Sequence, residues 1–325
     1  MSTLDATEHP ARRSLSRRRA RPGDVLLQGV AGSAAAGAAV LVGLITYKVA
    51  DGARLALSTF GLGFLTRVGW DPVHAHFGAA VFLFGTAVTS VGALILATPL
   101  ALGIALFLTE LAPRWIRGPV TALVETLAAI PSVVIGLWGI IVLGPVLRVH
   151  VMPALHSTLG FVPLFGPTSS GSTILTAIVV LTIMILPIIA SISRELFLGV
   201  PVELKEAALG LGTTRWEMVR GVVLPYARGG VAAAMILGVG RAVGEAIAVS
   251  QVIGAFDNGI SWNLFGSGDT IAAKLANEYS NATTDLDTSS LFYLALILLV
   301  FSLVINVLAR MVVRRAARRQ GLAAR

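Results

Sequence analysis

The sequence predicts an all-α integral membrane protein with six transmembrane helices. The prediction rests on composition: 55% of the 325 residues are hydrophobic, only 13% are charged, and the mean hydropathy is +0.83. A soluble domain usually has about 45–50% apolar and about 25% charged residues. The composition therefore excludes an ordinary soluble enzyme. The absence of cysteine excludes disulfides and thiolate metal sites, and five histidines supply little for other metal chemistry.

Six apolar runs are long enough to cross a bilayer, which requires about 20 mainly apolar residues at about 1.5 Å each. The segment before them, residues 1–24, is polar and arginine-rich and is expected to form a cytoplasmic tail. A second, basic tail follows at 314–325. One transmembrane domain is therefore expected over 25–313, with spans near 25–49, 80–109, 119–147, 173–199, 229–255 and 290–313.

The distribution of basic residues orients the predicted spans. If both termini are cytoplasmic, 19 of the 25 Lys and Arg residues fall in cytoplasmic segments, five fall outside, and Arg241 lies within a span. Cytoplasmic loops of membrane proteins carry such an excess of Lys and Arg. An even number of spans agrees with this orientation, so we expect both termini on the cytoplasmic side.

Three prolines, Pro99, Pro131 and Pro187, lie inside apolar runs. Proline lacks a backbone donor and its ring clashes with the preceding helical turn, so each is expected to kink or break its helix. In lipid such breaks are tolerated where neighbouring protein or a cavity satisfies the freed carbonyl, and transporters use them beside a substrate path. The alternative is that these prolines reflect only the general frequency of proline in membrane helices.

The most informative residues of the fifth span are Arg241 and Glu245. Arg241 is expected about eleven residues, roughly 17 Å of helix, from the cytoplasmic end, where burying a charge costs about 2.5–3.5 kcal/mol. The i, i+4 spacing predicts that the two side chains pair, and Gly240 and Gly244 would let a neighbouring helix approach closely. Two interpretations stay open: a structural ion pair, or an anion site in which the guanidinium binds phosphate oxygens.

Residues 200–228 form the longest cytoplasmic segment between spans and are predicted to contain two short helices. Gly210 and Gly212 are expected to end the first helix, and Thr214 with Glu217 forms a capping-box pattern that would begin the second. Two such helices could lie on the membrane surface. They could equally form a rigid knob that binds a partner.

Within this loop, Glu206-Ala207-Ala208 is followed by Gly212 six residues after the glutamate and then by Leu224-Pro225. This pattern resembles the EAA loop of ABC importer permeases. In that family the loop forms a coupling helix that docks into a groove of a separate ATP-hydrolysing subunit. The resemblance implies a type I importer permease fold and a non-catalytic chain that binds no cofactor, because ATP is bound by the partner ATPase. The matching residues are Glu206, Ala207, Ala208, Gly212, Leu224 and Pro225, with Val222 in place of the usual isoleucine.

The sequence itself also lacks a phosphate-binding loop for ATP. The nearest approach is Gly166 with Gly171 five residues later, but Ser172 stands where such a loop requires lysine. The energy for any ATP-driven process must therefore come from another chain.

Three further stretches resemble the C-type permease subunits of bacterial phosphate importers. They are parts of 64–86, the run 130–139, and 240–245, which contains Arg241 and Glu245. The resemblance implies that these two residues take part in phosphate movement across a bacterial inner membrane. It implies as partners an A-type second permease subunit, an ATPase dimer and an extracytoplasmic phosphate-binding protein. The alternatives are an ABC permease for another solute, such as sulfate or an amino acid, and a stand-alone carrier or channel.

Cysteine labelling tests the predicted orientation, because the chain has no native cysteine and every signal comes from the introduced thiol. We predict that Ser14→Cys and Ala316→Cys are protected from an impermeant thiol reagent in intact cells, whereas Ser280→Cys reacts. Labelling of either terminal site before the membrane is permeabilised would contradict the placement of both ends in the cytoplasm.

Overall fold

The structure is a computed structural model that describes residues 22–168, 170–256 and 259–318. The chain divides into two units at Lys48, and the first contains most of the single long helix α1 (Pro22–Gly52). Apart from its last three residues, the predicted tail 1–24 lies outside the described residues, as does 319–325. Six helical stretches are long and apolar enough to cross a membrane, which confirms the predicted class: Leu26–Gly52, Ala80–Leu111, Ser132–Leu159, Ile174–Leu198, Arg215–Gly244 and Asp285–Met311.

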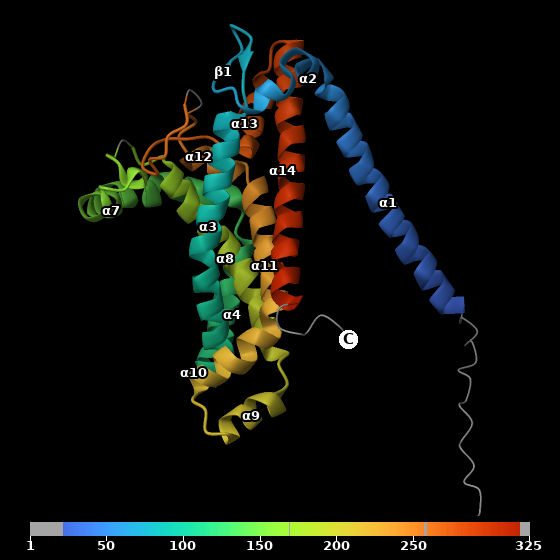
Figure 1. Cartoon of the computed structure of the whole chain (residues 1–325), viewed down its shortest axis with the longest axis vertical. Helices are drawn as coiled ribbons and strands as arrows, with labels where there is room; N and C mark the ends of the chain where they lie inside the picture. The colour runs from blue at the N-terminus through green and yellow to red at the C-terminus, as the bar shows by residue number, and fades with distance from the viewer. Residues whose placement is uncertain (1–21, 169, 257–258, 319–325) are drawn as a thin grey trace, which may run out of the picture. The chain divides into compact units, whose positions relative to one another are not determined.

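The second unit is built on the packing of α3 (Ala80–Leu106) against α8 (Ile174–Leu198), which run side by side (Figure 1). Small residues on α3 permit the close approach: a Cβ at Gly92 would lie 2.8 Å from the Ile178 side chain. The helices α11 (Leu224–Gly244) and α14 (Asp285–Arg318) complete the bundle. The buried apolar cluster includes Ala93, Ala97 and Ala101 from α3 and Ile178, Leu181, Ile185 and Ile189 from α8.

Of the kink or break expected at Pro99 and at Pro187, the break does not occur, since α3 and α8 each continue as α-helix through their proline. A proline inside a helix costs about 3 kcal/mol or more, and the apolar burial between these two helices offsets that cost. At Pro131 the helix does end. There α4 (Arg114–Ala129) stops, Pro131 has extended backbone with ψ 137°, and α5 (Ser132–Trp138) begins.

Four other prolines follow π-helical turns. In each case the residue before the proline donates its N–H to the carbonyl five residues back, as Leu224 does to Val219 before Pro225. The wider turn relieves the clash between a proline ring and the carbonyl four residues earlier. The turns are η2 (Phe107–Leu111), η3 (Gly139–Leu143), η4 (Leu147–Val151) and η6 (Val219–Val223), and they precede Pro113, Pro145, Pro153 and Pro225.

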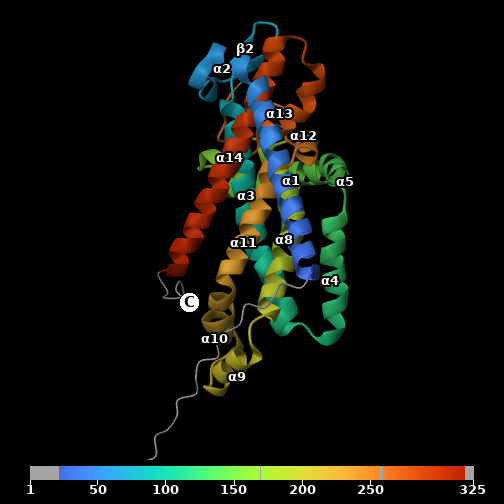
Figure 2. The ribbon, with the colours of Figure 1, turned by 90° about the vertical axis from the view of Figure 1, so that its right-hand side faces the viewer.

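The third span differs from the predicted range 119–147. Helix α4 contacts α8 and runs along the bundle, and the chain turns at Pro131 into a separate apolar stretch, Ser132–Leu159. Figures 1 and 2 show this stretch extending sideways from the bundle. The stretch consists of α5, η3, α6 (Gly144–Val146), η4 and α7 (Met152–Leu159), and the 3-10 turn η5 (Pro163–Phe165) follows it.

The fifth span ends earlier than the predicted boundary at 255. Helix α11 stops at Gly244, Glu245 has extended backbone (φ −74°, ψ 114°), and α12 (Ile247–Val252) begins two residues later. Helix α12 packs against α5, where a Cβ at Gly136 would lie 2.8 Å from the Cα of Ala248. The turn at Glu245 thus separates α11 from the short helix that makes this close contact with α5.

A cap of short elements covers the end of the bundle where α14 begins (Figure 1). Its core is aromatic: the rings of Phe64 and Tyr293 stack 4.6 Å apart, and Trp70 meets Phe77 edge-on at 4.8 Å. At its surface, the hydrogen bond from His74 lowers the pKa of the Asp71 carboxyl. The cap consists of α2 (Arg54–Phe60), η1 (Gly61–Leu65), β1 (Trp70–Asp71) paired antiparallel with β2 (His76–Phe77), α13 (Ile271–Glu278) and η7 (Tyr279–Asn281).

Two glycines of α3 provide a matched test of how the cap is attached. A Cβ at Gly85 would collide with the backbone carbonyl of Asp269, whereas a Cβ at Gly103 would meet nothing within 4 Å. We expect Gly85→Ala to lower the thermal unfolding temperature of the purified protein in detergent, with an overpacking cost of about 1–3 kcal/mol. Gly103→Ala should raise it slightly, since alanine favours a helix by roughly 0.5–1 kcal/mol. Equal stability of the two variants would contradict the close contact at Gly85.

Candidate functional site

An open groove of about 870 Å³ runs along α11, beside α8 and α14. Between Gly229 and Arg241 it follows twelve residues of α11, about 18 Å of helix. None of the described residues that line the groove is acidic, so its charge is positive. The lining residues are Gly229, Ala233, Ile236, Leu237, Gly240 and Arg241 from α11, Ile188 from α8, and Asn306 and Arg310 from α14.

Arg241 lies at one end of this groove, in the last turn of α11. Its side chain is exposed, and it makes no hydrogen bond or ion pair with any residue that the structure describes. The partial negative charge of a helix C-terminus favours a cation at this position. The dipole of α11 therefore stabilises the positive charge of Arg241 electrostatically, and the planar set of guanidinium donors remains available for an anion.

Glu245 does not pair with Arg241, contrary to the prediction from the i, i+4 spacing. Because α11 ends at Gly244, the two residues do not share a helix face. The Glu245 carboxylate instead accepts a hydrogen bond from the backbone N–H of Ala248 at 3.4 Å, in the first turn of α12. A carboxylate satisfies the free N–H groups at such a helix start. The structure therefore gives the two residues separate environments and contains no ion pair between them.

Asn306 and Arg310 are groove residues that the sequence analysis did not single out. They are spaced i, i+4 on α14, and Arg310 is the only charged residue between Asp287 and Arg314. A lone arginine near the end of a span is typical of a cytoplasmic anchor. Arg310 accordingly counts among the cytoplasmic basic residues that orient the spans. The sequence feature that could have indicated a place in the groove is the polar amide of Asn306, one turn earlier on the same face of an otherwise apolar helix.

The loop at 200–228 folds as predicted into two short helices, α9 (Val202–Gly210) and α10 (Arg215–Met218), at the opposite end of the bundle from the cap (Figure 1). Gly212, in the turn between them, has a positive φ of 83° that glycine adopts without strain. The predicted capping box is present: Thr214 Oγ1 accepts from the Glu217 N–H, and Glu217 Oε2 accepts from the Thr214 N–H.

The residues of the EAA motif divide between two faces of this loop. Glu206 and Ala207 are exposed, whereas Ala208 is half-buried and packs against the apolar cluster around Phe197 and Met218. Leu224 and Pro225 are half-buried at the start of α11. Large apolar side chains are exposed on the outward face, among them Leu211 (87%) and Trp216 (64%), next to exposed charged residues such as Glu203 and Glu206. An exposed apolar patch of this kind marks an interaction site.

The histidines and carboxylates are the side chains of the described residues that could hold a metal ion. Among the described residues, no three His, Cys, Asp or Glu side chains gather in one place. His74 and His76 make separate contacts, to the Asp71 carboxylate and to the Val68 carbonyl.

A membrane-spanning bundle with a groove lined by two arginines and an exposed loop with large apolar side chains at one end fits a membrane permease subunit. The sequence comparison agrees. Residues 97–318 match the family described as binding-protein-dependent transport system inner membrane component, and the chain belongs to this family.

Curated relatives extend the similarity over nearly the whole chain. The phosphate transport system permease protein PstC of Mesorhizobium japonicum is 44% identical over 302 residues, which cover 92% of each chain. The PstC protein of Pasteurella multocida is 42% identical over 287 residues, 87% of this chain and 89% of its own. PstC 2 of Mycobacterium tuberculosis is 40% identical over 308 residues, 93% and 95% of the two chains.

Solved structures show that the fold is that of ABC importer permeases. A bacterial ABC transporter that imports the acidic polysaccharide alginate superposes with a TM-score of 0.59 at 17% identity, covering 90% of this chain and 98% of its own. The inward-facing MetNI methionine ABC transporter superposes with a TM-score of 0.52 at 20% identity, covering 72% and 94%. At these identities the similarity concerns the fold alone.

The turn at Gly212 gives a direct test of the loop geometry. We expect Gly212→Val to add about 1–2 kcal/mol of backbone strain, because a β-branched residue disfavours positive φ. Limited proteolysis of the purified protein should then cut faster within 200–228, while membrane insertion stays unchanged. Gly210→Ala is the matched control, since Gly210 ends α9 and a Cβ there meets nothing within 4 Å. Equal cleavage rates in the two variants would contradict the strained turn.

Proposed function

We propose that this chain is a transmembrane permease subunit of an ATP-driven phosphate importer in a bacterial inner membrane. The observation that carries the proposal is the 44% identity, over 92% of both chains, with a phosphate transport system permease protein. The groove along α11 supports the same substrate class, because its only charged lining residues in the described chain, Arg241 and Arg310, are cationic.

Phosphate moves along the groove between these two guanidinium groups. Arginine presents a planar fork of donors that matches phosphate oxygens. Arg241 and Arg310 are both exposed rather than enclosed, so water competes with the protein for the anion. This arrangement favours brief contacts over tight binding, as transport requires.

The exposed side of α11 receives a second permease subunit of the A type, which closes the groove. Gly229, Ala233 and Gly240 lie on this side, and small residues of this kind let membrane helices pack closely. Gly244, at the end of the same helix, is exposed as well. The substrate path therefore lies between two related chains.

Energy comes from an ATPase dimer that docks on the outward face of α9 and α10, and phosphate is delivered by an extracytoplasmic binding protein. The chain itself carries no catalytic site and holds no cofactor. Both termini are cytoplasmic. The basic residue distribution supports this, as does the direction of α14, whose described end points toward the same end of the bundle as α9 (Figures 1 and 2).

Arg241→Gln tests the role of the groove. Uptake of radiolabelled phosphate by the assembled transporter should fall by roughly tenfold or more, since charge-assisted hydrogen bonds contribute about 1.5–3 kcal/mol each. Arg220→Gln is the matched control, because Arg220 is exposed on the same helical run but does not line the groove. Copurification of the partner subunits checks that both variants assemble. Normal phosphate uptake by assembled Arg241→Gln would rule out contact between Arg241 and the substrate.

A further inference from the structure

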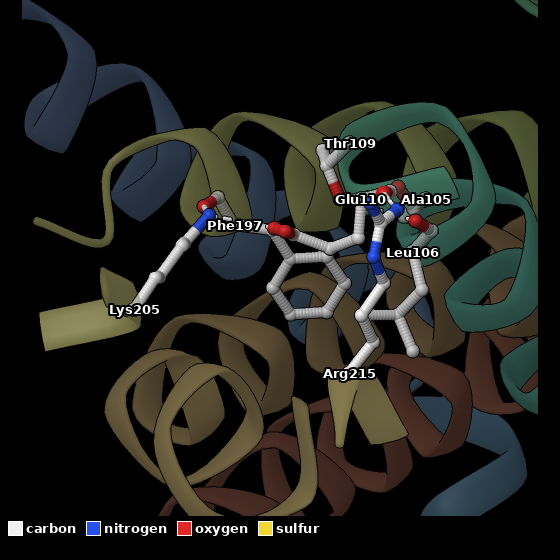
Figure 3. A network of polar contacts seen from close by, with 7 residues as sticks. All are labelled: Ala105, Leu106, Thr109, Glu110, Phe197, Lys205 and Arg215. Carbon is white, nitrogen blue, oxygen red and sulfur yellow. Dashed lines mark hydrogen bonds and ion pairs between the residues drawn. The ribbon is translucent and has the colours of Figure 1, made fainter. Parts of the chain in front are cut away.

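The inward face of α9 carries a charge that the docking function does not use. Of the nine residues of α9, Lys205 and Ala208 are half-buried and the other seven are exposed. The Lys205 ammonium lies 2.6 Å from Glu110 Oε1, at the end of η2, and the two side chains are only 16% and 11% exposed (Figure 3). A mostly buried pair attracts more strongly than one in open water, where such pairs contribute little.

The same ammonium also contacts the end of α8. Lys205 Nζ donates a hydrogen bond to the backbone carbonyl of Phe197 at 3.3 Å, in the last turn of that helix. The same carbonyl accepts from the backbone N–H of Val200 at 3.4 Å, and last-turn carbonyls are favourable acceptors for a cation as well. Lys205 therefore contacts the ends of both helices of the central α3–α8 pair, since η2 continues α3 directly.

The second short helix of the loop attaches at the same residue. Arg215 Nη1, at the start of α10, donates to the backbone carbonyl of Glu110 at 3.4 Å (Figure 3). Thr109, the residue directly before Glu110, donates from Oγ1 to the carbonyls of Ala105 and Leu106, one turn earlier, at 3.0 and 3.3 Å. Glu110 is thus the point where both helices of the loop meet the end of α3.

We propose that Lys205 and Glu110 are positioning residues that transmit displacement of the cytoplasmic loop to the α3–α8 pair. Ala208 is the α9 residue that packs into the apolar cluster around Phe197 and Met218, and such packing has little directionality, whereas the ion pair gives α9 a directional attachment to the bundle. Because α3 and α8 pack along their length, a pull on Glu110 and Phe197 moves both helices together. This inference rests on the proposed function, in which an ATPase docks on the loop.

The test uses the assembled transporter in proteoliposomes and measures phosphate transported per ATP hydrolysed. Lys205→Met and Glu110→Gln should each lower this ratio by roughly tenfold, within the usual range of coupling between sites, while the ATPase still copurifies. Lys205→Arg keeps the positive charge and should stay near the wild-type ratio. Arg194→Gln is the matched control, because it removes an ion pair of equal length, 2.6 Å, between neighbouring residues of α8.

A covalent tether separates a positioning role from a merely structural one. In the double variant Glu110→Cys, Lys205→Cys, a short bifunctional cross-linker that attaches to both thiols through disulfide bonds should restore the ratio. Reduction of those disulfides should abolish the recovery. The absence of native cysteine confines the cross-link within this chain to the introduced pair.

Three outcomes would overturn the inference: an unchanged ratio in Lys205→Met, loss of the ATPase from the complex, or no recovery after cross-linking. Failure of the wild-type transporter to move phosphate would instead contradict the proposed function. The ratio could then be measured with the solute that it does move.

Discussion

The close packing of α3 against α8 is the contact on which the other elements of the second unit depend. Small residues on α3 allow it, and the buried aliphatic side chains of α8 fill the seam. The gain is large enough that both helices retain an internal proline, Pro99 and Pro187, without ending. Helices α4, α11 and α12 then pack on α8, and α13 packs on α3. A change in this seam would therefore displace both the groove and the loop.

The groove and the loop are joined by one helix. Ile188 of α8 lines the groove, and nine residues later, about 13 Å along the helix, the Phe197 carbonyl accepts the hydrogen bond from Lys205. A rigid helix with internally satisfied hydrogen bonds transmits a displacement between these two points without a chain of side-chain rearrangements. The arrangement gives a physical route from the loop to the groove that requires only movement of α8 with its partner α3.

Proline has three different effects in this chain, and only the surroundings distinguish them. Pro187 lies buried in the packed α3–α8 seam within a continuous helix, Pro131 ends a helix and redirects the chain, and Pro225 follows a π turn that widens the backbone. The local chemistry is the same in each case: a missing donor and a ring that strikes the carbonyl four residues earlier. The outcome depends on whether neighbouring helices stabilise the straight path, which a single segment does not encode.

The sequence by itself determined the features that are local or depend on composition. Apolar runs predicted the six-span class, positive φ at Gly212 follows from the glycine turn, and the Thr214–Glu217 capping box depends on residues three apart. Tertiary structure alone decided the features that join distant segments. It ended α11 at Gly244 and packed α12 against Gly136 of α5. The end of α11 separates Glu245 from the helix face of Arg241. It also brought Lys205 to Glu110, 95 residues earlier in the chain. Helical periodicity places residues on a face, but which face meets which neighbour is decided by how whole helices pack.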